Sequence, residues 1–244
     1  SVRPVFVLSD ERRRRIEQAP VVVVTSAQNN TRTNVPFFDA LRRYCAERDG
    51  ELVVVPIRYK NPTSTLEPQD DEPDVFWDAP LVPYLCEEDV QLHEHLAVLA
   101  SVRIAATRLR PLSGLDAISR GRCAIFGHSQ LAMRVVPTPQ HALPALLYAS
   151  GSITLPNYSR STQGALAGFY HTPAAVLVER DGDLFHLRDV TWDGEQFVDV
   201  ARAYRAKGRS RRAGRALALV TGDQHEWFRD EQVVEATFAR DGAS

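Results

Sequence analysis

The hydrophobic pattern is clearest between residues 21 and 57, where two short apolar runs flank an amphipathic stretch. Val21–Val24 is an unbroken β-branched run, which is typical of a strand buried on both faces. One helical stripe follows it, made of Phe37, Leu41, Tyr44 and Cys45. Residues 52–57 form the second apolar run. A strand, helix and strand of these lengths predict two parallel neighbours joined by a right-handed crossover.

A polar segment follows each of these two strands, TSAQNNT at residues 25–31 and YKNPTS at residues 59–64. Both segments are expected at the carboxyl edge of the sheet, where open α/β sheets bind ligands. Amides donate and accept hydrogen bonds and a lysine adds positive charge, so the loops suit a polar or phosphorylated group. The alternative is that these side chains hold the loops together. The candidate substrate-binding residues are Gln28, Asn29, Asn30, Tyr59, Lys60, Asn61 and Thr63.

Two Asp-Gly pairs, Asp181-Gly182 and Asp193-Gly194, separate runs rich in β-branched and aromatic residues. Such pairs favour type I′ hairpin turns, so residues 174–200 are predicted to form a three-stranded antiparallel meander. Other strands are expected at residues 97–104, 122–126, 133–136 and 215–220, and helical segments at residues 115–119 and 230–239. Residues 10–18 fit either a charged helical turn or a linker. Residues 142–150 fit either a helix or a strand, and residues 154–172 are expected to form a long polar loop.

The predicted fold class is α/β, with a mostly parallel sheet and flanking helices, extended by the antiparallel β-meander. Four parts are expected along the chain. They are an N-terminal arm (1–20), an α/β module that includes the meander (21–200), a basic linker (201–214) and the start of a further domain (215–244).

The composition is that of an ordinary globular protein, with 244 residues, 44% hydrophobic and 25% charged. The net charge of −2 gives no global argument for nucleic acid, but the charges are unevenly distributed. No lysine or arginine lies between Asn61 and Ser101, whereas seven basic residues and no acid lie from Arg202 to Arg215. This basic run is either a solvated loop or a patch that meets phosphate. The candidate DNA-binding residues are Arg209, Arg211 and Arg212.

The three cysteines, Cys45, Cys86 and Cys123, are widely spaced and form no CxxC pair. This spacing disfavours structural zinc and favours reduced thiols. No apolar run approaches the length of a membrane span and the N-terminus lacks a signal-peptide core. We therefore expect a cytoplasmic protein without membrane insertion. The two ends do not resemble a natural start and finish, which favours a fragment of a longer protein.

A short metal-binding pattern lies near the end of the chain, where Asp223 and His225 follow an apolar run and Gly222. Residues two apart at the end of a strand point the same way, so both side chains can ligate one ion. The pattern matches the first metal motif of calcineurin-like metallophosphoesterases, which use two metals to orient water. It also fits a strand-end turn with an N-capping aspartate.

His128 is the candidate catalytic residue, because it follows Phe126-Gly127 at a predicted strand end where general acid/base chemistry is feasible. His141 and His171 are open to the same roles. The chain has no G-x-S-x-G elbow, P-loop or G-x-G-x-x-G fingerprint.

Several segments together resemble a family of large tailed-phage and prophage proteins, the DNA-transfer type early proteins with a calcineurin-like phosphoesterase C-terminal half. They are VVVTSAQNNT (22–31), VVVPIRYKNPTS (53–64), RPLSGLDAI (110–118), IFGH (125–128), VPTPQ (136–140), GSITLPNY (151–158), GDLFHLRDV (182–190) and RALALVTGDQH (215–225). The resemblance implies that residues 21–200 are an N-terminal module and that Asp223 and His225 open the metallophosphoesterase domain. It also implies a divalent metal, Mn or Mg, in the full-length protein. The later metal motifs of the family are absent from this chain, and a second histidine that the family tends to show beside the equivalent of His171 is missing.

The function hypothesis is a phage-type early protein acting on or near DNA, in which this chain binds substrate or partner for a metal-dependent phosphodiesterase or nuclease. One alternative is a non-catalytic module that captures a host protein through its acidic residues 67–94. Another is a stand-alone hydrolase that uses the polar loops and His128. An exposed basic patch favours DNA, an exposed acidic and aromatic surface favours a protein partner, and a deep pocket lined by Asn30, Lys60 and His128 favours a hydrolase. The sequence makes no prediction of oligomeric state.

Overall fold

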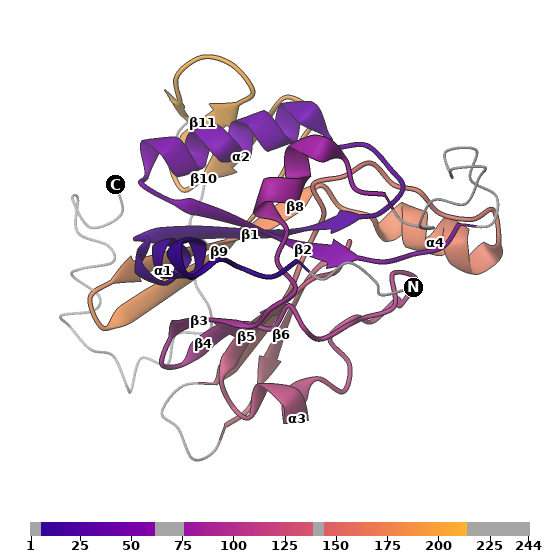
Figure 1. Ribbon diagram of the computed structural model, residues 1–244, viewed down its shortest axis with the longest axis horizontal. Helices are drawn as coiled ribbons and strands as arrows, with labels where there is room; N and C mark the ends of the chain where they lie inside the picture. Colours follow the sequence, from indigo (N-terminus) through magenta and orange to yellow (C-terminus); the bar gives the residue numbers. More distant parts are fainter. Residues whose placement is uncertain (1–5, 62–75, 139–143, 214–244) are drawn as a thin grey trace, which may run out of the picture. The chain divides into compact units, whose positions relative to one another are not determined.

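The computed structural model describes residues 6–61, 76–138 and 144–213 (Figure 1). The chain divides into two compact units, residues 1–213 and residues 214–244, and all described residues belong to the first. Several predicted features lie outside the described residues, namely Thr63, His141, Asp223, His225, the strand at 215–220 and the helix at 230–239.

The strand–helix–strand unit is formed as predicted. β1 (Val21–Gln28) and β2 (Glu51–Ile57) are parallel neighbours, and α2 (Val35–Glu47) connects them. Asn34 caps the helix, because its side chain accepts a hydrogen bond from the backbone N–H of Phe37. Every residue of β1 is buried, which explains its continuous run of valines.

Two later strands complete this first sheet in the order β2-β1-β8-β9. β8 (Ala174–Asp181) pairs antiparallel with β1, and β9 (Leu184–Thr191) pairs antiparallel with β8. The predicted first hairpin is therefore present, with Gly182 and Asp183 as its loop. Only Gly182 has a positive φ, of 58°, so the turn is not the type I′ turn that we expected.

The expected three-stranded meander over residues 174–200 is wrong in its second half. β10 (Gln196–Asp199) does not pair with β9 but forms a separate small sheet with β11 (Arg202–Arg205) and β12 (Arg211–Arg212). The strands β11 and β12 occupy the segment 201–214, for which we expected a linker.

The third sheet has the strand order β3-β4-β5-β7-β6. Its strands are β3 (Val90–His93), β4 (Leu96–Val98), β5 (Cys123–Phe126), β6 (Leu131–Val136) and β7 (Ala145–Ser150). The ambiguous segment 142–150 thus contains a strand, and the strand expected over 97–104 ends early, at Val98.

The other helices are α1 (Asp10–Gln18), the 3₁₀ helix η1 (Ala79–Tyr84), α3 (Asp116–Ser119) and α4 (Thr162–Tyr170). α3 agrees with the sequence prediction, and α1 agrees with the helical alternative for residues 10–18. α4 lies inside the expected polar loop 154–172, so that expectation was wrong. Within the described part of the chain no helix is both long and apolar enough to cross a membrane.

The first sheet lies between two layers, and alternate residues of its strands enter different cores. Val21 and Val23 pack against α2 and the small β10–β12 sheet. Val22 and Val24 pack on the opposite face against β3, β4 and α1. The strands of the third sheet bury their other face in a third cluster around Phe126. These layers confirm the α/β class, but the sheets are mixed rather than mostly parallel. Among the described residues, three strand pairs are parallel (β1–β2, β4–β5 and β5–β7) and the others are antiparallel.

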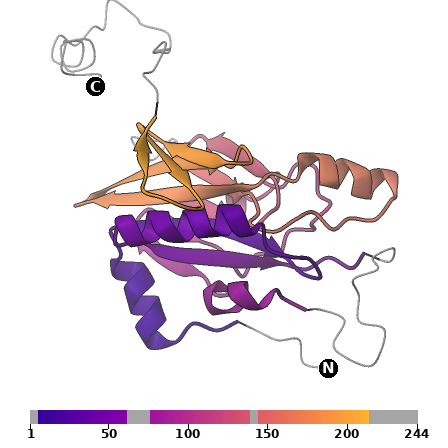
Figure 2. The same ribbon diagram turned by 90° about the horizontal axis from the view of Figure 1, so that it is seen from above.

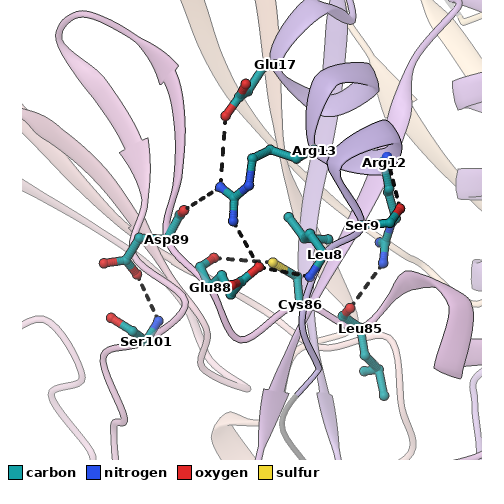
Figure 3. A network of polar contacts seen from close by, with 10 residues as sticks. All are labelled: Leu8, Ser9, Arg12, Arg13, Glu17, Leu85, Cys86, Glu88, Asp89 and Ser101. Carbon is teal, nitrogen blue, oxygen red and sulfur yellow. Dashed lines mark hydrogen bonds and ion pairs between the residues drawn. The ribbon is translucent and has the colours of Figure 1, made fainter.

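Acidic residues after η1 anchor the N-terminal arm to the body of the protein (Figure 3). Glu88 Oε2 accepts hydrogen bonds from the backbone N–H of Leu8 at 2.8 Å and from Arg13 Nη2 at 2.9 Å. Asp89 Oδ1 accepts from the N–H of Ser101 at 2.9 Å, and Arg12 donates to the carbonyl of Leu85 at 3.1 Å. The described acidic residues 87–89 are therefore engaged in internal contacts.

Candidate functional site

The carboxyl ends of strands from two sheets meet at one edge of the fold. A Cβ atom at Gly127, which follows β5, would lie only 2.3 Å from Val55 Cγ1 of β2, so only glycine allows this approach. Beyond β7, Ser152 forms a bridge with Ser26 of β1, and Thr154 forms one with Thr33. The polar loops after β1 and β2 therefore lie beside the loop after β7, as their position at the carboxyl edge predicted.

The Asn29 side chain fastens the second polar loop to the first. Its Nδ2 donates to the carbonyl of Tyr59 at 3.0 Å, and its Oδ1 accepts from the N–H of Tyr59 at 2.6 Å. One amide thus satisfies both backbone groups of Tyr59, the second residue after β2, which fixes the distance between the two loops.

Asn157 makes the corresponding connections from the third loop. The Gln28 side chain donates to the Asn157 carbonyl at 2.7 Å and accepts from its N–H at 2.9 Å. Asn157 Nδ2 donates to the carbonyl of Asn30 at 2.8 Å, and Asn157 Oδ1 accepts from Asn61 Nδ2 at 2.8 Å. No sequence motif singled out Asn157, although it lies in a segment that carries the phage resemblance.

Burial separates the candidate substrate-binding residues into two groups. Gln28, Asn29, Asn30 and Asn61 are buried and bonded to neighbouring loops, Tyr59 is half-buried, and Lys60 is exposed. These contacts are those expected of side chains that hold loops together. Substrate binding by the loops stays a prediction, for which Lys60 offers the exposed group.

His128 is fully buried, and both ring nitrogens lie within hydrogen-bonding distance of a backbone group. Nδ1 accepts from the N–H of Gln130 at 3.1 Å, so Nε2 carries the proton that is donated to the carbonyl of Ala105 at 3.2 Å. Burial lowers the pKa of His128 to about 4, against the opposing effect of the Ala105 hydrogen bond. The imidazole is therefore neutral at pH 7 and connects the loop before α3 to the end of β5.

A second, half-buried polar cluster braces the C-terminal end of α4. Tyr158 donates its hydroxyl proton to Ser129 Oγ at 2.6 Å and lies 3.3 Å from His171 Nδ1. His171 Nε2 donates to the carbonyl of Thr154 at 2.8 Å. Burial raises the pKa of Tyr158 to about 12 and lowers the pKa of His171, so both are neutral at pH 7. Sequence reasoning named His171 but missed Tyr158 and Ser129, whose partners are distant in the chain.

No group of three or more histidine, cysteine, aspartate or glutamate side chains that could hold a metal ion occurs among residues 6–61, 76–138 and 144–213. The predicted ligands Asp223 and His225 are outside this part of the chain.

An open pocket of about 420 Å³ lies on the third sheet, between residues 109–113 and residues 130–134. Its lining includes Arg110 and Met133 but none of Asn30, Lys60 or His128, the residues expected to line a hydrolase pocket.

The three candidate DNA-binding arginines lie on the basic hairpin, which we define as residues 202–212 of β11, β12 and their connection. Arg209, Arg211 and Arg212 are exposed, and none of them forms an ion pair with a described residue. Arg43 of α2 holds the hairpin in place, since it donates to the carbonyls of Ala206 at 3.0 Å and Gly208 at 2.7 Å. Figures 1 and 2 show the hairpin beside α2, away from α4 and the polar loops.

The fold and these two regions define an α/β protein with a closed polar edge and a separate basic surface. Comparison with protein-family models finds no match. The chain is 28% identical over 232 residues to Protein A1 of Escherichia phage T5, an alignment covering 91% of this chain and 41% of that protein. The chain thus spans about two fifths of the length of this relative. A solved structure of a Vps29 double mutant from Entamoeba histolytica aligns with 71% of this chain and 94% of its own, at 12% identity and a TM-score of 0.38. The similarity to a phage protein agrees with the phage part of the resemblance found in the sequence.

Proposed function

We propose that this chain is the DNA-binding module of a phage-type early protein, and that it contacts the phosphate backbone through the basic hairpin. The observation that carries the proposal is the exposure of six cationic side chains within one anchored hairpin, without an acidic residue in its sequence. They are Arg202, Arg205, Lys207, Arg209, Arg211 and Arg212. Arginine and lysine side chains of this kind supply most of the affinity for DNA that is independent of sequence.

The similarity to Protein A1 of phage T5 supports the phage-type assignment. The phosphodiesterase or nuclease step is proposed for the longer protein only, with Mn²⁺ or Mg²⁺ and with Asp223 and His225 as first ligands. A metal at such a site would orient water for an in-line attack on phosphorus.

The two alternatives have less support from the described residues. Glu87 and Glu88 bind the N-terminal arm, and Trp77 and Tyr84 are half-buried against the core, so these residues do not form an open acidic surface for a host protein. The acidic residues 67–74 of that segment lie outside the described residues. The hydrolase alternative requires an accessible His128, but this imidazole is fully buried.

The test is binding of a labelled DNA duplex across a salt series, with and without Mn²⁺. In the Arg209→Ala, Arg211→Ala, Arg212→Ala triple variant, we expect weaker binding and a slope of log K against log salt that is shallower by about 0.9 for each lost phosphate contact. A matched control removes the same charge from another surface, by Arg14→Ala, Arg15→Ala and Arg103→Ala, and should bind more tightly than the hairpin variant.

Equal affinities and slopes of the two triple variants would refute the hairpin as the DNA contact. Cleavage in Mn²⁺ that disappears in Asp223→Ala would assign the catalytic step to this chain rather than to a longer protein. Binding without cleavage is the expected result.

A further inference from the structure

Helix α4 exposes its large apolar side chains and buries its small ones. Phe169 is 80% exposed, Tyr170 46% and Leu166 40%, whereas Gly164 and Ala167 face the body of the protein. A surface helix normally has the opposite arrangement, with its apolar stripe towards the core. The outer face of α4 is therefore an apolar and aromatic surface that the described residues leave uncovered.

Close packing fixes this orientation of the helix. A Cβ atom at Gly164 would lie 2.2 Å from the carbonyl oxygen of Ser159, so the helix approaches the preceding loop as nearly as a glycine allows. Ser159 is itself held by Tyr59, whose hydroxyl donates to Ser159 Oγ at 3.0 Å. At the other end, His171 bonds to Thr154. Both ends of α4 are thus fixed to the polar edge, and the exposed rings are held on a rigid support.

The segments that surround α4 have a positive charge. Residues 25–38, 57–61 and 151–173 contain no aspartate or glutamate. They present Arg32, Lys60 and Arg160 at the surface. The acidic groups that contact these segments include Asp78, which is half-buried and accepts two hydrogen bonds from Thr33, and Glu87, which pairs with Arg58.

The position of Arg32 relative to α4 follows from the backbone. The N–H of Leu155 donates to the carbonyl of Arg32 at 2.9 Å, and Leu155 follows Thr154, the residue to which the end of α4 is bonded. Leu155 is also exposed, so it extends the apolar surface towards the cation. Arg160 precedes Ser161, the N-cap of α4.

Exposed aromatic rings on a surface that also carries exposed cations suit a ligand that is both anionic and aromatic. Single-stranded nucleic acid has both properties, because each unpaired base has a π-face for stacking and each nucleotide has a phosphate. In a duplex the base faces are already stacked on one another and cannot reach an aromatic side chain. An apolar protein partner would fit the rings but would gain nothing from the three cations.

We propose that the outer face of α4 is a stacking platform for single-stranded DNA, on which unpaired bases contact Phe169 and Tyr170 while Arg32, Lys60 and Arg160 contact phosphates. The proposal rests on the proposed function as a DNA-binding module, and it adds a second contact region with a preference for unpaired bases.

The test compares an oligo-dT strand with a duplex of the same length. Phe169→Leu and Tyr170→Leu keep an apolar side chain but remove the ring, and each should weaken oligo-dT binding about five-fold or more. Phe169→Tyr keeps the ring and should bind as the unmodified protein does. Leu184→Ala, a substitution of an exposed apolar residue on β9, is the matched control and should change neither affinity.

Salt dependence separates stacking from charge. Phe169→Leu removes no charge, so it should lower oligo-dT affinity at every salt concentration without changing the slope of log K against log salt. Arg160→Gln should instead reduce that slope, by about 0.7 for one lost phosphate contact to a single strand.

Unchanged oligo-dT affinity in the Phe169→Leu, Tyr170→Leu double variant would overturn the platform, and it would leave duplex binding by the basic hairpin intact. Failure of the proposed function gives a different result, because the hairpin variant would then bind duplex like its charge-matched control. Equal weakening of oligo-dT and duplex by Phe169→Leu would also overturn the preference for unpaired bases.

Discussion

Asp199 connects the basic hairpin to the rest of the fold, and its removal is the sharpest test of how that surface is held. The carboxylate ends β10 and is almost completely buried. It accepts hydrogen bonds from Tyr44 Oη of α2 at 2.8 Å and from Arg188 of β9 at 2.6 Å and 3.1 Å. Arg188 also contacts Glu179 of β8 at 2.7 Å. The pKa of Arg188 is raised mainly by its hydrogen bonds to Asp199, so the guanidinium stays charged.

The cost of Asp199→Ala can be worked out from these contacts. The substitution leaves Arg188 with Glu179 alone and leaves the Tyr44 hydroxyl without its acceptor. Breaking a buried ion pair by removing one partner costs about 3–5 kcal/mol. Because the Arg188 side chain keeps Glu179 and is 25% exposed, we expect the lower end, about 3 kcal/mol. For a chain of this size that corresponds to a fall in Tm of about 6–12 °C.

The measurement is urea and thermal unfolding, followed by circular dichroism, of Asp199→Ala, Asp199→Asn, Arg188→Ala and the double alanine variant. Asp199→Asn keeps the shape and one acceptor, so it should lose only about 1–2 kcal/mol. The double variant should be more stable than the sum of the two single losses predicts, because both substitutions break the same pair. A loss below about 0.5 kcal/mol in Asp199→Ala, or strict additivity, would refute this account.

Two further predictions concern the polar edge. Burial holds the pKa of His128 at about 4, below its ordinary 6.5, so the unfolded chain binds more protons and stability falls as the pH drops from 6.5 towards 4. Between pH 7 and pH 5, the free energy of unfolding measured in urea should therefore fall by about 2 kcal/mol less in His128→Gln than in the unmodified protein. An equal fall in the two proteins would contradict the buried neutral imidazole. Gly164→Ala should lower the stability by about 1–3 kcal/mol, because its Cβ would lie 2.2 Å from the carbonyl oxygen of Ser159. Gly168→Ala is the matched control, since its Cβ would meet Tyr158 at an ordinary 3.6 Å, and similar Tm values for the two variants would contradict the close packing of α4.

Short sequence patterns were sufficient to predict those strands, helices and turns whose conformation depends on a few neighbouring residues. The valine run of β1 and the apolar stripe of α2 gave the strand–helix–strand unit, and the Asp181-Gly182 pair gave the β8–β9 hairpin. The position of β8 beside β1 could not be predicted in this way, because the two strands are about 150 residues apart and β1 would accept any buried apolar strand.

The Asp-Gly turn does not determine which strand β10 pairs with. Packing of aromatic side chains on α2 explains why β10 pairs with β11. The chain does turn at Asp193-Gly194, where the Asp193 N–H donates to the Gln196 carbonyl at 3.0 Å. Phe197 and Tyr204 then stack at 5.2 Å and pack against Tyr44 of α2. Burial of three aromatic rings on the helix outweighs pairing with β9, since each such side chain buries a large apolar area. Propensity also misled at α4, where two glycines and an outward apolar face hid a helix that the capping residue Ser161 does indicate.

The sequence placed the polar loops at the correct edge but left open whether they bind a ligand or one another. The difference depends on Asn157, which lies more than 90 residues from every partner among Gln28, Asn30 and Asn61. Each of these amides has little freedom once bonded, so the edge is rigid before any ligand arrives. The backbone that carries Lys60 and the rings of α4 is then held in place, so the protein loses less conformational entropy when a ligand binds there. In the proposed contact with DNA, the buried amides contribute without touching the ligand, because they fix the backbone of the surface that does.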